Sequence, residues 1–225
     1  MCDWVGWVGK LDKKEVETLG QLIWPGNPHA TGVGLHLGDR ILIRKAPLTA
    51  PEYFRKRSWG KWFYKHHRNM VGGLLHTRFA TNGSPKNNLN NHPHISVDTG
   101  SVLVHQGVVR PSYLYPAISD CDSEQLLHAL DHKGLIHGIL DCPGKIIVAY
   151  ISGNQRDRVW LYSNSTAITI LRLGDRTIFS TCIEGDALSK HQWTCVSLDG
   201  EIQEGPSVPR KEISRVSMQG MWSDF

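Results

Sequence analysis

The sequence has 225 residues, of which 40% are hydrophobic and 20% are charged. These values exclude a disordered chain and suit a single globular domain that spans residues 1–225. The formal net charge of +4 falls well short of what a dedicated nucleic-acid-binding protein carries.

Neither a membrane span nor a secretory signal is visible in the sequence. No run approaches about 20 apolar residues, and Met1-Cys2-Asp3-Trp4 lacks a basic region followed by a long apolar run. The five cysteines are odd in number and form no C-x-x-C pair. We therefore expect a cytoplasmic protein with reduced thiols, without membrane contact, a cofactor or a bound metal.

The first half of the chain predicts two helices, a hairpin and a strand. Asp12 with Glu15 forms a capping-box pattern, and apolar residues then recur at near-helical spacing. Turn residues between two apolar runs predict a hairpin over residues 35–43. A second helix is predicted over residues 51–67, and a β-branched run predicts a strand over residues 101–105.

The second half of the chain predicts one helix and several strands. The helix begins near Asp122 and stops at Gly134. The strands and hairpins are predicted over residues 146–152, 159–162, 171–179 and 197–202. Helices interspersed with antiparallel strands indicate an α+β domain with two substantial sheets.

Four short segments in a fixed order carry the chemistry that the sequence suggests. The segments are Met1-Cys2, LHTRFATNGSP at residues 75–85 with NHPH at residues 91–94, VHQGVV at residues 104–109, and SDCDSE at residues 119–124. Each segment is a weak signal alone, whereas their joint order and spacing are specific.

In these segments the chain resembles the glutaminase domain of class II glutamine amidotransferases, a group that includes glutamine:fructose-6-phosphate amidotransferase. The resemblance covers nearly the whole chain. It implies the four-layer αββα sandwich of N-terminal nucleophile hydrolases, which agrees with the α+β prediction. It also implies a glutaminase, which hydrolyses the side-chain amide of L-glutamine through a Cys2 thioester to glutamate and ammonia.

The catalytic residues that follow are Cys2, Gln106 and Gly107. An N-terminal cysteine brings its own base, because an α-amino group titrates near about 7.7 to 8.0, so removal of Met1 is part of the expected mechanism. Gly107 is suited to present a backbone N–H to the oxyanion. The resemblance makes the preceding side chain the second donor, which is Gln106 here and asparagine in the relatives. The longer stem either misplaces the donor or is compensated by a shifted backbone.

The resemblance also implies the substrate-binding residues. Arg78 matches the arginine that grips the α-carboxylate of glutamine, for which a guanidinium offers two parallel hydrogen bonds. Asp122 matches the acidic residue that holds the α-ammonium, although Asp122 with Gln125 also resembles a helix N-cap with its partner. Phe79 is expected to cover the substrate, and Thr81 to contact it.

The chain departs from the relatives at other positions too. Asp3 stands where many of them have glycine, Phe79 where the best-known ones have tryptophan, and Asn82 where they often have histidine. His92 and His94 have the look of metal ligands, but the resemblance assigns them to the structure of their loop.

Residues 53–68 interleave basic and aromatic side chains, a composition that can bind single-stranded nucleic acid. The same pattern suits a helix with an apolar buried face and a solvated cationic face, which is the interpretation that we favour.

We expect a glutaminase that hands its ammonia to a separate synthase or ligase, because the chain reaches only residue 225, which leaves no room for a second catalytic domain. Two alternatives stay open. One is an amidohydrolase that acts on a γ-glutamyl peptide or another linear amide. The other is a catalytically silent binding module, which the departures at Gln106 and Asp3 suggest.

Overall fold

The computed structural model describes residues 2–209, which form two antiparallel sheets. The seven-stranded sheet contains, in spatial order, β11 (Asp186–Ala187), β9 (Thr169–Leu173), β10 (Arg176–Ser180), β1 (Asp3–Val8), β4 (Gly72–Arg78), β2 (Ala30–His36) and β3 (Ile41–Ala46). The six-stranded sheet contains β13 (Ile202–Ser207), β12 (Gln192–Ser197), β8 (Gln155–Ser163), β7 (Gly144–Ser152), β6 (Val102–Val109) and β5 (His94–Ile95).

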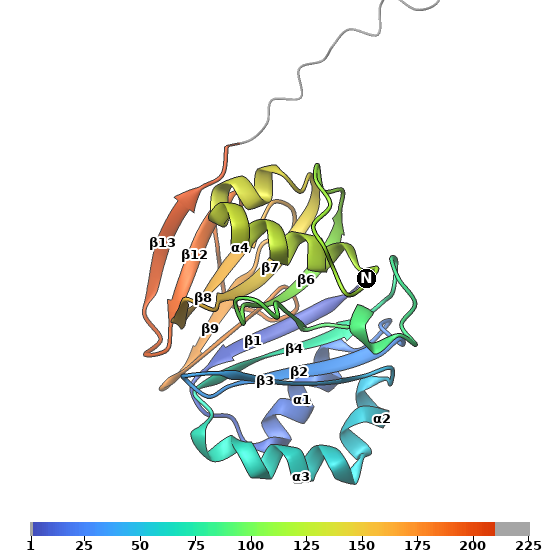
Figure 1. Cartoon of the computed structure of the whole chain (residues 1–225). Coiled ribbons are helices and arrows are strands. Elements are labelled where there is room, and N and C mark those ends of the chain that lie inside the picture. Colours follow the sequence, from blue (N-terminus) through green and yellow to red (C-terminus); the bar gives the residue numbers. More distant parts are fainter. Residues whose placement is uncertain (1, 210–225) are drawn as a thin grey trace, which may run out of the picture.

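Helices cover the outer face of each sheet, so that the molecule has four layers (Figure 1). The seven-stranded sheet is covered by α1 (Lys13–Ile23), α2 (Ala50–Arg55) and α3 (Arg57–His66), followed by the short 3-10 helix η1 (His67–Asn69). The long helix α4 (Asp122–Leu140) covers the six-stranded sheet, and a second 3-10 helix, η2 (Asn88–Asn90), lies in the loop after β4.

Three buried apolar clusters correspond to the three interfaces between these layers. One cluster joins α1, α2 and α3 to the seven-stranded sheet and includes Trp59. The second lies between the sheets and includes Phe179, and the third joins the six-stranded sheet to α4 and includes Trp193. Within β1, Trp4 belongs to the cluster between the sheets and Trp7 to the cluster under the helices. Because successive side chains of a strand point to opposite faces of the sheet, β1 contributes to two apolar clusters.

The start of α1 follows the sequence prediction. The Asp12 carboxylate accepts a hydrogen bond from the backbone N–H of Glu15 at 2.8 Å, and the Glu15 carboxylate accepts one from the N–H of Asp12 at 2.7 Å. This reciprocal capping box is therefore confirmed. The predicted helix over residues 51–67 is wrong in one respect: Lys56 is extended, with ψ 124°, and divides it into α2 and α3.

The prediction that the third helix stops at Gly134 also needs a correction. Gly134 has a left-handed φ of 74° with ψ 178°, which interrupts the helix, but the helix resumes and continues to Leu140. The N-cap residue is Cys121 rather than Asp122. The Gln125 amide bonds to both backbone groups of Tyr115, so the alternative capping role of Asp122 with Gln125 is wrong.

All the predicted strands and hairpins are present, several of them longer than expected. Sequence analysis missed β1 and β4, which lie side by side near the middle of the seven-stranded sheet. None of the helices within residues 2–209 combines the length and the apolar character that crossing a bilayer requires.

Candidate functional site

Cys2 lies where β1 begins and β4 ends. The two strands pair so that Asp3 faces Thr77, which brings Cys2 beside Phe79. The Cys2 thiol accepts a hydrogen bond from the Phe79 N–H at 3.3 Å and donates one to the Phe79 carbonyl at 3.1 Å. The position of the thiol is thus fixed by backbone groups at the end of β4.

A cavity of about 200 Å³ opens at this thiol. It brings together five of the seven residues that the sequence suggested for the site, together with Val108 and Lys145; the five are Cys2, Phe79, Thr81, Gln106 and Gly107. Arg78 and Asp122 are not among the lining residues. The cavity therefore unites the candidate nucleophile with the candidate oxyanion donors.

Gln106 is held in place by two neighbours. Its Nε2 donates to the Asp3 carboxylate at 3.1 Å, and its Oε1 accepts from the Thr181 hydroxyl at 3.1 Å. The other Asp3 oxygen accepts from the Asn27 amide at 2.8 Å. A side-chain amide has two N–H groups, so one N–H of Gln106 remains for a ligand. Two of the four departures from the relatives, Asp3 and Gln106, are thus hydrogen-bonded partners.

Gly107 adopts a backbone conformation that side chains resist. Its φ is 142°, and an added Cβ would lie 1.8 Å from the carbonyl oxygen of Lys145. Only glycine permits this close approach of β6 to β7 beside the cavity.

Arg78 is buried, with 2% of its surface exposed. Its guanidinium donates to the Asn91 side chain at 2.9 Å and to the backbone carbonyls of Asn82 and Gly83. These bonds use three of the five N–H groups of a guanidinium and hold the loop after β4 in shape. The remaining N–H groups are the ones that could bind a carboxylate.

Asp122 lies in the first turn of α4, where the helix dipole favours a negative charge. One of its carboxylate oxygens accepts a hydrogen bond from the Val109 N–H at 2.8 Å. Asp122 is therefore tied to the end of β6, the strand that also carries Gln106 and Gly107.

Burial dominates the electrostatics of Cys2. It raises the pKa of the thiol to about 11, against the backbone contact with Phe79 and the positive charge of Arg78, both of which lower it. Because the thiol faces a small cavity rather than open solvent, this effect persists although the residue is partly exposed. The thiol is protonated at neutral pH and needs a base to become a nucleophile.

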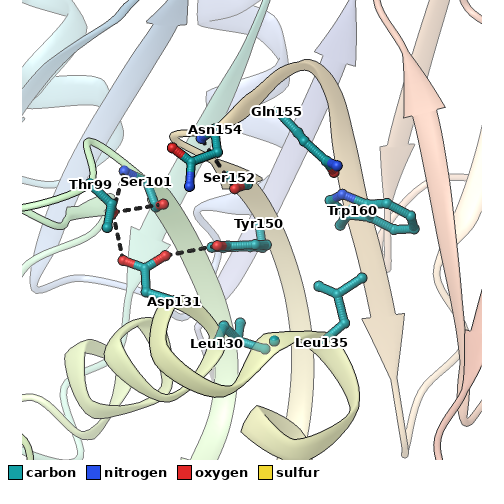
Figure 2. A pocket seen from close by; sticks show the side chains of 11 residues that line it. Thr99, Ser101, Leu130, Asp131, Leu135, Tyr150, Ser152, Asn154, Gln155 and Trp160 are labelled. Carbon is teal, nitrogen blue, oxygen red and sulfur yellow. Dashed lines mark hydrogen bonds between the residues drawn. The ribbon is translucent and has the colours of Figure 1, made fainter.

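A second cavity, of about 190 Å³, lies between α4 and strands β7 and β8 (Figure 2). Its carboxylate, Asp131, already accepts hydrogen bonds from the Tyr150 hydroxyl at 2.8 Å and the Thr99 hydroxyl at 2.7 Å. The lining residues include no thiol. Both of these hydrogen bonds of the carboxylate are made to other residues of the lining.

Comparisons with known proteins find similar sequences and similar folds. No protein-family model matches the chain. The glutamine–fructose-6-phosphate aminotransferase [isomerizing] of Clostridium tetani is 29% identical over 200 residues, which are 80% of this chain and 31% of that protein. The chain spans about a third of the length of the curated relatives it matches.

Two solved structures share the fold. The glutamine phosphoribosylpyrophosphate amidotransferase of B. subtilis, complexed with ADP and GMP, has a TM-score of 0.62 at 14% identity and covers 91% of this chain and 49% of its own. A glutamine aminotransferase class-II domain protein of Silicibacter pomeroyi has a TM-score of 0.54 at 14% identity and covers 92% of this chain and 100% of its own. The predicted αββα sandwich is thereby confirmed.

Proposed function

We propose that this chain, which resembles class II glutamine amidotransferases in sequence and has their fold, hydrolyses L-glutamine with the Cys2 thiol as nucleophile. The observation that carries the proposal is the cavity at Cys2. The cavity is lined by Cys2 together with Gln106, Gly107, Phe79 and Thr81. Such a cavity suits a linear side chain that ends in an amide.

The reaction begins once Met1 is removed, because the nitrogen of Cys2 is otherwise a peptide nitrogen without basicity. The freed α-amino group takes the proton of the thiol, and the thiolate attacks the amide carbon. The Gly107 N–H and the remaining N–H of Gln106 stabilise the oxyanion. The ammonium of Cys2 returns the proton to the departing ammonia, and water then hydrolyses the thioester to glutamate and the free thiol.

The α-amino-acid end of glutamine would bind beyond the cavity lining. In this proposal, Arg78 offers its remaining N–H groups to the carboxylate, and Asp122 offers its second oxygen to the ammonium. Phe79, which is 41% exposed, covers the bound substrate, and Thr81 contacts it. In this proposal the ammonia passes to a synthase or ligase partner.

Intact mass spectrometry tests the nucleophile and the pocket together. The purified protein is incubated with 6-diazo-5-oxo-L-norleucine, a reactive analogue of glutamine. We expect loss of Met1 and one adduct that maps to Cys2, and no adduct on Cys2→Ala. Retained Met1 or an absent adduct would contradict the proposal and favour the silent binding module.

A matched pair of variants tests the substrate class. Arg78→Ala should abolish the release of glutamate from glutamine. Arg172→Ala, which replaces an exposed residue of β9, should leave this release unchanged. Activity that survives Arg78→Ala would instead point to a γ-glutamyl peptide or another linear amide.

A further inference from the structure

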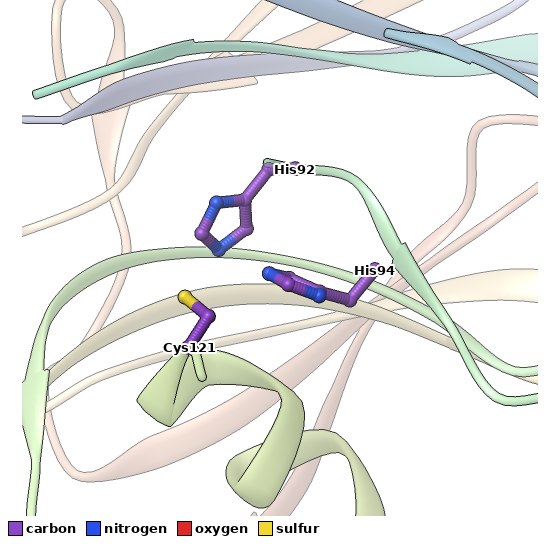
Figure 3. A group of neighbouring side chains, drawn as sticks. All are labelled: His92, His94 and Cys121. Atoms are coloured by element: carbon purple, nitrogen blue, oxygen red, sulfur yellow. The ribbon is translucent and has the colours of Figure 1, made fainter. Parts of the chain in front are cut away.

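His92, His94 and Cys121 come together beneath the loop that follows β4 (Figure 3). The two histidines flank Pro93 at the start of β5, and Cys121 is the N-cap of α4. All three side chains are buried, with 3%, 3% and 4% of their surfaces exposed. One potential ligand atom from each lies within 4.8 Å of the other two.

The imidazoles of this cluster contact one another and His92 stacks on His76, but three of their ring nitrogens have no hydrogen-bond partner in residues 2–209. Both ring nitrogens of His92 and the Nε2 of His94 are buried without a hydrogen bond to any residue in the described part of the chain. The Cys121 thiol makes a weak contact, at 3.8 Å, with the Asp122 carboxylate and also interacts with the backbone and the hydroxyl of Ser123. Burying a ring nitrogen without a hydrogen-bond partner is unfavourable, so two such imidazoles that converge with a thiol call for a ligand.

We propose that His92, His94 and Cys121 bind one zinc ion. Imidazole nitrogen and thiolate are the donors that zinc prefers, whereas calcium and magnesium require oxygen. Ligand atoms in a tetrahedral zinc site lie about 3.3 to 3.6 Å apart, so the cluster would contract by about 1 Å on binding. Three protein ligands leave the fourth position for water.

Charges of both signs surround the cluster, and Arg78 acts on both His94 and Cys121. Lys45 and Arg78 act on His94 with positive charge. The Asp122 carboxylate acts on Cys121 with negative charge, and the thiolate formed on binding supplies another. Lys45 is moreover held by the backbone carbonyls of Asn91 and Pro93.

The ion would connect two segments on which the substrate site depends. His92 follows Asn91, which holds the Arg78 guanidinium, and Cys121 precedes Asp122. Zinc would therefore fix the distance between the loop after β4 and the first turn of α4. This role goes beyond the glutaminase proposal, since it concerns metal binding and is measured without turnover.

Cobalt is a spectroscopic probe for this site. The full chain is stripped of metal with a chelator and titrated with Co²⁺. We expect one equivalent to bind, with the visible bands of tetrahedral cobalt and a near-ultraviolet thiolate-to-cobalt band. Cys121→Ser should lose the thiolate band and bind at least tenfold more weakly, and His94→Gln should also bind at least tenfold more weakly.

Three other cysteines supply controls. Cys142→Ser and Cys195→Ser replace thiols that are buried elsewhere, and Cys2→Ala replaces the nucleophile; all three should keep the bands and the stoichiometry. Circular dichroism checks that each variant is folded. The proposal is overturned if the wild-type chain binds no cobalt, or if the thiolate band survives in Cys121→Ser and disappears in Cys2→Ala.

Discussion

Gln106 and Asp3 act together, because the Gln106 amide donates to the Asp3 carboxylate at 3.1 Å. Gln106→Asn shortens the stem by one methylene and breaks this bond. We expect kcat for glutamate release to fall about a hundredfold, the usual cost of a misplaced oxyanion donor. The double variant Asp3→Gly with Gln106→Asn, which restores the pair of the relatives, should recover most of that loss. Equal kcat values for the single and double variants would contradict the partnership.

The backbone at Gly107 supports a second prediction. Gly107→Ala places a Cβ 1.8 Å from the Lys145 carbonyl oxygen at a φ of 142°. A strained φ alone costs about 1 to 3 kcal/mol. Because the added Cβ also clashes with a backbone carbonyl, we expect the free energy of unfolding to fall by more than this, and the activity to be lost. The control is Gly174→Ala, where φ is 64° and no atom lies within 4 Å of the added Cβ. Denaturant titration should show a smaller loss there.

The sequence motifs predicted individual residues of the site. They did not predict the contacts between residues that belong to different motifs. The Cys2 cavity contains five of the predicted residues. Asp3 and Gln106 are 103 positions apart, so nothing local signals their hydrogen bond. Cys121 likewise lies in a different motif from His92 and His94, and only the packing of α4 brings it to them.

At the scale of elements, the basic and aromatic segment is divided between a buried and an exposed face. Trp59 and Phe63 are fully buried under the seven-stranded sheet, whereas Tyr64 is 60% exposed. The favoured structural interpretation therefore accounts for the buried aromatic residues of α2 and α3.

Trp59→Ala should therefore lower the free energy of unfolding by about 3 to 5 kcal/mol, because it leaves a large cavity. Tyr64→Ala is the matched control on the same helix and should change it by less than about 0.5 kcal/mol. Urea titration followed by circular dichroism measures both. Similar losses for the two variants would be inconsistent with this division of faces.

The missed strands have a physical reason. Five of the six residues of β1 and all seven of β4 are buried, because helices and the second sheet cover the two faces. Such strands lack the alternation of polar and apolar residues that reveals a half-exposed strand. The hairpins were predictable because glycine and aspartate mark their turns.

At the scale of the whole molecule, burial favours the neutral form of several histidines. Burial lowers the pKa of His76 from 6.5 to about 3, and it also lowers the pKa of His36. In the unfolded chain these imidazoles bind protons below about pH 6.5. Unfolding then takes up protons, so this contribution to stability is complete above pH 6.5 and is lost as the pH falls toward 3.

We therefore expect the free energy of unfolding of the metal-free protein to fall between pH 6.5 and 4. Each such histidine contributes up to about 1.4 kcal/mol per pH unit. His36→Gln should reduce the slope, because burial lowers the pKa of His36 in the folded chain. Urea titrations at several pH values give the slopes. An unchanged slope for His36→Gln would contradict the assignment.

The Cys2 cavity draws its walls from both sheets: Cys2 precedes β1 of one sheet, and Gln106 and Gly107 lie on β6 of the other. The apolar side chains between the sheets, which include Phe179 and Ile147, therefore set the distance between the Cys2 sulfur and the proposed oxyanion donors. Replacing one of these side chains with a slightly smaller one, far from any reacting atom, would tilt one sheet against the other. The proposed reaction would then slow, although the protein would still fold. Under the proposed function, laboratory evolution of the rate of glutamate release would accordingly collect substitutions between the two sheets.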